Sequence, residues 1–188
     1  MKKSILIILV SACFFIQSNA QEQVKFLGCS LNNKLYAVVD SLVTKGYNVQ
    51  FNNKKTKASL SGDYANLTNV QIEINATPIS NFVYSIIVSK NSNLGKLEFS
   101  YTSLLERFEK KYGELSPSKK SLADFSLTGS GIAYFDLVDE NNVKYGYIMI
   151  HYSKSSEKGT DELTIIFVDI KNNQLNSEEK EKSIDNDI

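Results

Sequence analysis

Hydrophobic residues in the first half of the chain change from a helical spacing to the alternation of strands. From Leu31 to Val43 they recur every three or four positions, which is typical of one face of a helix. Ser30 is predicted to cap this helix and Gly46 to end it. Four apolar runs follow this helix. In the last of them, Phe82–Val88, apolar residues occupy consecutive positions, as in a strand covered on both faces. The strands expected here are Tyr47–Phe51, Ala58–Tyr64, Val70–Ile74 and Phe82–Val88.

The same order returns in the second half. A second helical spacing runs from Leu97 to Tyr112, and Gly113 is predicted to end that helix. Asp139–Asn142 is predicted to form the turn of a hairpin, and Gly129–Gly131 a further turn. The strands expected after the second helix are Phe125–Leu127, Ile132–Val138, Val143–Tyr152 and Leu163–Ile170.

These patterns predict an α+β fold made of two tandem units, each a helix followed by about four strands. Helices and sheets each have an apolar face, so the units are expected to form one antiparallel sheet with the helices packed on one face. A single domain is expected over residues 21–170, with a pseudo-repeat at 24–92 and 93–170. Residues 171–188 are expected to be a polar C-terminal tail, in which Ser177 to Asp187 form either an exposed helix or a loose segment.

The first twenty residues have the three parts of a secretory signal peptide. Lys2 and Lys3 form the charged part, the following run to Ile16 is apolar, and Ser18-Asn19-Ala20 presents small residues to a signal peptidase. The apolar run is shorter than the ~20 residues that cross a bilayer. The pattern therefore predicts an exported protein, periplasmic or secreted, without a transmembrane span.

Val10-Ser11-Ala12-Cys13 offers an alternative, because it resembles the lipobox of bacterial lipoproteins, in which Cys13 would carry a lipid anchor. A mature protein beginning Cys-Phe-Phe-Ile would lack the usual polar tether, which favours cleavage after Ala20. In that case Cys29 is the only cysteine left, and no internal disulfide forms.

The charge composition argues against one class of function, nucleic-acid binding. Lys and Arg total 21, Asp and Glu total 21, and Arg107 is the only arginine. A nucleic-acid partner calls for a basic face and for arginines that contact phosphates and bases. No nucleic-acid partner is therefore expected. The 42% of hydrophobic residues is enough for a full core.

Catalytic and metal-binding groups are scarce. His151 is the single histidine, so a Ser-His-Asp, Cys-His or histidine-based metal site would have to use it. It lies in an expected strand, and the chain has no glycine-flanked serine elbow, so His151 is interpreted as a structural or surface residue. The sequence predicts no enzymatic activity, no metal and no cofactor.

Clusters of acidic residues provide an alternative, an envelope glycan hydrolase. Paired carboxylates can act as the acid and the base of such an enzyme. Because both clusters fall at expected strand ends or turns, solvated turns are the simpler explanation. The clusters are Asp136, Asp139 and Glu140, and Asp161 with Glu162.

Tyrosines give the main candidate for binding. Four of the ten tyrosines fall on expected neighbouring strands of the second half. If one face of the sheet is left uncovered by helices, exposed tyrosines there would suit recognition of a protein or glycan of the cell envelope. The alternative is that they complete the core and only their hydroxyls reach water. The candidate binding residues are Tyr134, Tyr145, Tyr147 and Tyr152.

Several stretches resemble an uncharacterised family of exported proteins from Bacteroides-type bacteria. The resemblance covers most of the chain after Ala20, and it implies export but no particular activity. The stretches are Lys25-Phe26-Leu27-Gly28 with the helix ending Leu42-Val43-Thr44-Lys45-Gly46-Tyr47, Leu104 to Gly113 with its Phe-Glu-Lys-Lys-Tyr-Gly ending, and Phe167-Val168-Asp169-Ile170-Lys171-Asn172 with the acidic tail.

The tandem layout also resembles the β-lactamase-inhibitor-protein-like fold, which includes small envelope lipoproteins of outer-membrane assembly. Members open each half with a Gly-Met-Thr-type helix start, of which Leu27-Gly28-Cys29-Ser30 is a loose equivalent. The disulfides of the inhibitor are missing. The resemblance implies the fold, but inhibition of a β-lactamase does not follow from it. An immunity or inhibitor protein is a third expected class, beside a binding protein and a hydrolase.

Overall fold

A seven-stranded antiparallel sheet is the main element of the computed structural model, which describes residues 22–50, 56–113, 130–155 and 159–185. Its strand order is β3-β4-β5-β6-β9-β8-β7, and β1 and β2 form a separate hairpin. The predicted α+β class is confirmed. The strands are β1 (Lys25–Phe26), β2 (Cys29–Ser30), β3 (Asn48–Gln50), β4 (Lys57–Tyr64), β5 (Leu67–Ala76), β6 (Val83–Asn93), β7 (Ser130–Val138), β8 (Lys144–Ser155) and β9 (Thr160–Asp169). The helices within the described ranges are α2 (Leu35–Val43), α3 (Glu98–Tyr112) and α5 (Ile170–Asp185).

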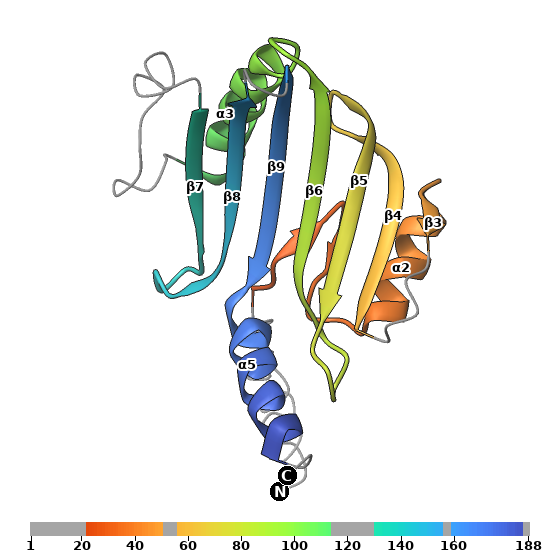
Figure 1. Cartoon of the computed structure of the whole chain (residues 1–188). Helices are drawn as coiled ribbons and strands as arrows, with labels where there is room; N and C mark the ends of the chain where they lie inside the picture. Colours follow the sequence, from red (N-terminus) through yellow and green to blue (C-terminus); the bar gives the residue numbers. More distant parts are fainter. Residues whose placement is uncertain (1–21, 51–55, 114–129, 156–158, 186–188) are drawn as a thin grey trace, which may run out of the picture.

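Helices α2 and α3 cover the same face of the sheet, as Figure 1 shows, with α2 behind β4 and α3 behind the β7–β8 end. The hairpin β1–β2 lies on that side too, and its Phe26 ring packs edge-on against Phe167 of β9, with 5.1 Å between the ring centroids. The core therefore fills the space between one sheet face, two helices and the hairpin. None of the described helices has the length and apolar character needed to cross a membrane.

The two predicted helices are confirmed, but the first begins later than expected. Its N-cap is Lys34, whereas Ser30 belongs to β2 and its Oγ accepts the N–H of Asn32 at 3.1 Å. A hairpin turn at Leu27 and Gly28, both with positive φ, leads into β2, and residues 31–34, which the pattern had assigned to the helix, connect β2 to α2. Helix α3 ends at Gly113, whose φ of 87° suits a glycine.

In the second half, strands β7, β8 and β9 lie close to the strands expected at Ile132–Val138, Val143–Tyr152 and Leu163–Ile170. The expected strand Phe125–Leu127 and Gly129 lie outside the described residues. Gly131 lies inside β7 and not in a turn. In β6 only one face is covered by helices: Ile86 is fully buried, whereas Ile87 is half-buried on the opposite face.

The C-terminal segment is a helix, one of the two forms expected, but it is not simply exposed, because Asn172, Asn176 and Glu179 are buried against the domain. Asp169 caps α5 by accepting the N–H of Asn172 at 2.9 Å. The Asn172 side chain donates to the carbonyl of Val83 at 2.9 Å. Further along α5, six residues before it ends at Asp185, the carboxylate of Glu179 accepts the N–H groups of Ile79 at 2.7 Å and Ser80 at 3.0 Å. Polar contacts therefore hold α5 against the turn between β5 and β6.

Candidate binding site on the open sheet face

The face of the sheet opposite α2 and α3 is here called the open face, and Figure 1 views the sheet from this side. Side chains alternate between the two faces along each strand. In β8, Ile148 and Ile150 are fully buried on the helix side, whereas Tyr147, Met149 and His151 are half-buried on the open face.

The strand register aligns apolar side chains in a row across the open face. Ile87 on β6 is paired with Ile166 on β9, Ile166 with Met149 on β8, and Met149 with Tyr134 on β7. Directly opposed residues in neighbouring strands lie ~4.5–5.5 Å apart, so these four side chains touch in sequence across four strands.

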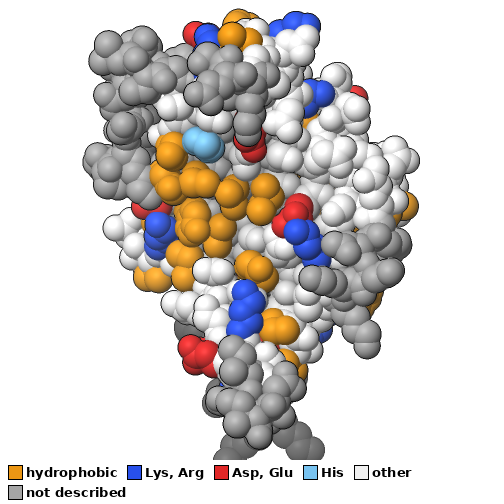
Figure 2. All heavy atoms as spheres, viewed as in Figure 1, with side chains coloured by type: hydrophobic (Ala, Val, Ile, Leu, Met, Phe, Trp, Pro, Cys, Tyr) orange, Lys and Arg blue, Asp and Glu red, His pale blue; other side chains and the backbone are white. Residues whose placement is uncertain are grey.

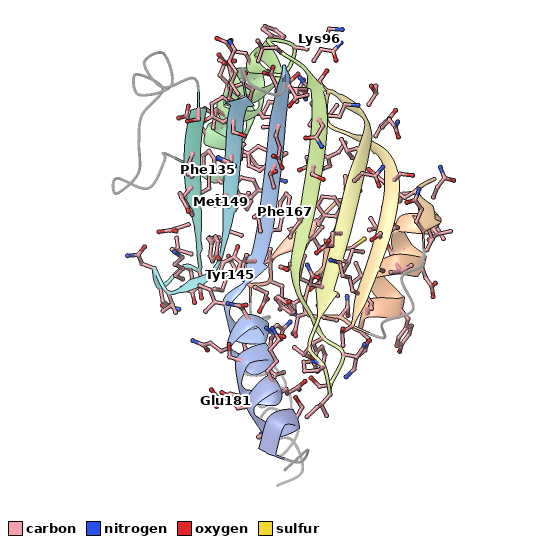
Figure 3. The ribbon with its side chains drawn as sticks, viewed as in Figure 1. Lys96, Phe135, Tyr145, Met149, Phe167 and Glu181 are labelled. Atoms are coloured by element: carbon pink, nitrogen blue, oxygen red, sulfur yellow. The ribbon has the colours of Figure 1, made fainter. Side chains whose placement is uncertain are left out.

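Two neighbouring rows extend this surface along the strands. One contains Tyr147, whose partner Val168 on β9 is only 5% exposed, and the other contains His151 and Ile132. Figure 2 shows a hydrophobic cluster on this face with the histidine at its margin, and Figure 3 labels Met149 within it. The apolar patch is defined here as Ile87, Ile132, Tyr134, Tyr147, Met149 and Ile166.

Charged residues border the apolar patch, and four of them form two ion pairs, one on each side. On the β7–β8 side, Lys144 Nζ lies 2.5 Å from Asp136 and 5.3 Å from the centroid of the Tyr147 ring. On the β4–β5 side, Lys57 lies 2.5 Å from Glu73. The two tyrosine rings of the patch, Tyr134 and Tyr147, are 6.4 Å apart between centroids.

Two of the four candidate tyrosines do not lie on the open face. Tyr152 is 0% exposed and stacks on Tyr101 of α3, and burial together with nearby Asp161 raises its pKa to about 12. It shares the phase of Ile148 and Ile150 along β8, so the alternation itself places it in the core. The prediction of an exposed Tyr152 is wrong.

Tyr145 is displaced by a β-bulge. Leu137 pairs with Gly146 and Val138 with Lys144, so Tyr145 is the extra residue of β8 at this point. Tyr145 packs against the buried core, and Figure 3 labels it near the lower end of β8. Its burial, and to a smaller extent the negative charge of Glu22, raises the pKa of its hydroxyl. The candidate binding residue Tyr145 therefore does not lie beside Tyr147 on the open face, because the bulge breaks the alternation.

Several residues of the patch were missed by the sequence analysis, which considered only tyrosines. Their signal is nevertheless present, because β8 and β9 are apolar in both phases. A strand with one solvated face alternates apolar and polar residues. In β9 the buried Ile165 and Phe167 flank Ile166, which therefore belongs to the second face.

The acidic residues of the hydrolase alternative are held in separate local contacts. Asp136 pairs with Lys144, and Asp139 caps its own turn by accepting the N–H groups of Asn141 at 2.9 Å and Val143 at 2.8 Å. Asp161 is fully buried and accepts the N–H of Leu97 at 3.2 Å, whereas its neighbour Glu162 is exposed. No observation on these carboxylates favours a shared acid–base site. Among the residues that the structure describes, no three His, Cys, Asp or Glu side chains are placed to hold a metal ion.

The fold and the patch together define the class of protein: an α+β domain whose antiparallel sheet has helices on one face and an apolar surface on the other. No family model, no curated protein and no solved structure matches the chain.

Proposed function

We propose that this is an exported, non-enzymatic protein of the cell envelope that binds a macromolecular partner, a protein or a glycan, through the apolar patch. The observation that carries the proposal is the continuous row Ile87–Ile166–Met149–Tyr134, which no described helix covers. Single exposed apolar residues are common on protein surfaces, but contiguous patches of a few hundred Å² are often functional. A toxin or enzyme that is blocked by such a contact is one form that the partner could take.

Export is supported by the N-terminal pattern, whose residues lie outside the described ranges. A start at Gln21 corresponds to a soluble periplasmic or secreted protein, and an acylated Cys13 corresponds to a lipoprotein. The intact mass of the protein purified from cells that express the full chain distinguishes the two forms. The mass of the unprocessed chain would contradict export.

We infer further that the domain consists of two related units, as the resemblance to the β-lactamase-inhibitor-protein-like fold implies. Helix α2 is followed by β3 to β6, and helix α3 is followed by β7 to β9. The two sets meet at β6 and β9, and the strand order of the second set mirrors that of the first. This arrangement supports two units side by side, with the patch mainly on the second.

The binding proposal is tested by affinity capture from envelope extract. Tyr147→Ser and Tyr134→Ser each remove a ring from the patch, and truncating an interface aromatic often weakens binding by more than about 2 kcal/mol. We expect the partner retained by the unaltered protein to be lost with either variant. Tyr36→Ser is the matched control, because Tyr36 is 67% exposed but lies on α2. Equal capture by all four proteins, or capture of nothing, would contradict the proposal.

A further inference from the structure

We propose that the turn between β5 and β6 is a carboxylate-binding site, and that α5 is a strap that fills this site with its own Glu179. The site is separate from the apolar patch and does not depend on the proposed function. Figure 1 shows α5 beside this turn, at the lower end of the sheet. Three features support the strap: the hydrogen bonds to Glu179, the contacts that hold the turn in shape, and the polar side on which α5 is packed.

The turn holds Glu179 through backbone groups, as an anion site holds its ligand. The successive N–H groups of Ile79 and Ser80 donate to one carboxylate oxygen at 2.7 Å and 3.0 Å. The Ser80 N–H also lies 3.2 Å from the other oxygen. Successive backbone N–H groups in a turn form a concave site for anions, and Glu179 is buried in this one at 5% exposed.

The turn is held in shape by contacts that do not involve α5. Thr77 is fully buried, its N–H donates to the carbonyl of Phe82 at 2.8 Å, and its hydroxyl accepts the N–H of Phe82 at 3.0 Å. From the start of α2, Nζ of Lys34 donates to the carbonyl of Ser80 at 2.5 Å. The carboxylate site therefore keeps its form when α5 moves away.

Helix α5 is attached to the domain by its polar side. Its buried residues are Asn172, Asn176 and Glu179, and residues 180–183 beyond them are exposed. A helix of 16 residues has marginal stability in water unless an apolar face is packed. Segments with few buried apolar contacts open locally while the rest of a protein stays folded. The part of α5 beyond Asn176 is thus expected to open from the turn on its own.

The contact depends on the negative charge of Glu179. Burial acts to raise the pKa of this carboxyl, but hydrogen bonds from Ser80, Ile79 and Thr77 outweigh it and lower the pKa below 4.5. The strap is therefore most stable above pH 4.5 and is weakened as the pH falls through the lower pKa of the docked helix.

The other charged groups near this contact do not replace Glu179. The turn itself, residues 77–82, contains no titratable side chain, and Lys34 reaches it from α2. On α5, the neighbours Glu178 and Lys180 are exposed. At the start of α5, burial raises the pKa of Asp169 although the N–H of Asn172 donates to it, so acid acts there in the opposite direction. Acid is therefore expected to open only the far end of the helix.

Amide hydrogen exchange followed by NMR tests the strap, on protein purified from cells that express the full chain. The amides of Ile79 and Ser80 are expected to exchange through an opening at least about tenfold more frequent than the one that exposes the fully buried Ile150 of β8. Corrected for the intrinsic rate, this opening is expected to become more frequent between pH 5 and 3. Glu179→Gln is expected to abolish that pH dependence, and the control Glu178→Gln to keep it.

A titration with sodium acetate tests the carboxylate site. Glu179→Ala empties the site, so acetate is expected to shift the amide resonances of Ile79 and Ser80 in this variant until the change saturates. In the unaltered protein the tethered Glu179 occupies the site at high effective concentration, so the same acetate is expected to leave both resonances in place. Acetamide, which has no charge, and sodium chloride at equal ionic strength are the controls.

Equal opening frequencies for Ile79, Ser80 and Ile150 in the unaltered protein would mean that α5 leaves the turn only when the whole domain unfolds, and the strap would be overturned. The carboxylate site is overturned when acetate shifts neither resonance of Glu179→Ala, or when chloride or acetamide shifts both to the same extent. The exchange measurement needs no variant, so it decides about the strap even where Glu179→Ala does not fold.

Discussion

The ring of Tyr101 on α3 stacks on the ring of Tyr152 on β8, with 5.5 Å between the centroids and 27° between the planes. Both side chains are almost completely buried, at 2% and 0% exposed. Beside them, a Cβ atom at Gly131 on β7 would lie 2.5 Å from the hydroxyl of Tyr101. Helix α3 thus approaches the sheet where β7 has no side chain.

Gly131→Ala is expected to destabilise the fold by about 1–3 kcal/mol, because the new methyl group has to push the Tyr101 ring off its stack. Urea unfolding measures the loss. In a Tyr101→Phe background the hydroxyl is gone, and the nearest ring carbon is then 3.0 Å from the new Cβ. The cost of Gly131→Ala is therefore expected to be smaller there, and an equal cost in both backgrounds would contradict the steric explanation.

The same two tyrosines are expected to make stability fall in alkali. Burial raises the pKa of Tyr101 to about 12, and burial together with Asp161 raises the pKa of Tyr152 to about 12, from an ordinary value of 10.0. Above pH 10 the unfolded chain loses these protons first. The stabilisation is therefore complete below pH 10 and is lost as the pH rises toward 12.

Each phenol contributes a slope of up to about 1.4 kcal/mol per pH unit in that window. Tyr152→Phe is expected to make the free energy of unfolding fall less steeply between pH 10 and 12, as measured by urea unfolding at several pH values. Tyr36→Phe is the control, because Tyr36 is 67% exposed. An unchanged slope in Tyr152→Phe would show that this phenol does not control the loss.

Alternation and helical spacing predicted the elements whose buried side is apolar. Helix α3 and strands β7, β8 and β9 fall in this class, and glycine at position 113 marked the end of the helix. The predictions went wrong where the backbone departs from its period. The bulge at Tyr145 depends on pairing with β7, a contact between distant residues that one strand's pattern does not contain.

Helix α5 could not be predicted as a packed element because its buried side is polar. Asn172, Asn176 and Glu179 recur at helical spacing and are 2%, 6% and 5% exposed. Methods that follow apolar periodicity interpret such a segment as solvated. Its burial is explained by partners elsewhere in the chain, the backbone groups of Val83, Ile79 and Ser80.

Asn172→Leu is expected to destabilise the fold by about 1–3 kcal/mol, because it leaves buried carbonyl groups without a donor. The Asn172 amide donates to the carbonyls of Val83 at 2.9 Å and Leu31 at 3.4 Å. Asn173→Leu is the matched control, because Asn173 is the next residue of α5 and is exposed. Thermal unfolding of the two variants measures the difference, and equal midpoints would contradict a role for the amide.

The contact between α5 and the β5–β6 turn depends on pH, because it is made by the carboxylate of Glu179. Burial acts to raise the pKa of this carboxyl, but hydrogen bonds from Ser80 and Ile79 outweigh it and lower the pKa below 4.5. The folded protein therefore binds this proton less readily than the unfolded chain does. The stabilisation is present above pH 4.5 and is lost as the pH falls through the lower pKa of the folded state.

Glu179→Gln is expected to lower the free energy of unfolding by about 1–2 kcal/mol at pH 7, because a neutral amide accepts the N–H groups of Ile79 and Ser80 less strongly than a carboxylate. The difference from the unaltered protein is expected to shrink below pH 4.5, where that protein's own carboxyl becomes protonated. Urea unfolding between pH 3 and 7 measures both. Glu178→Gln is the control, since Glu178 is exposed on the same helix. A loss of the same size at every pH would mean that the amide disturbs packing and that the charge of Glu179 does not hold the helix in place.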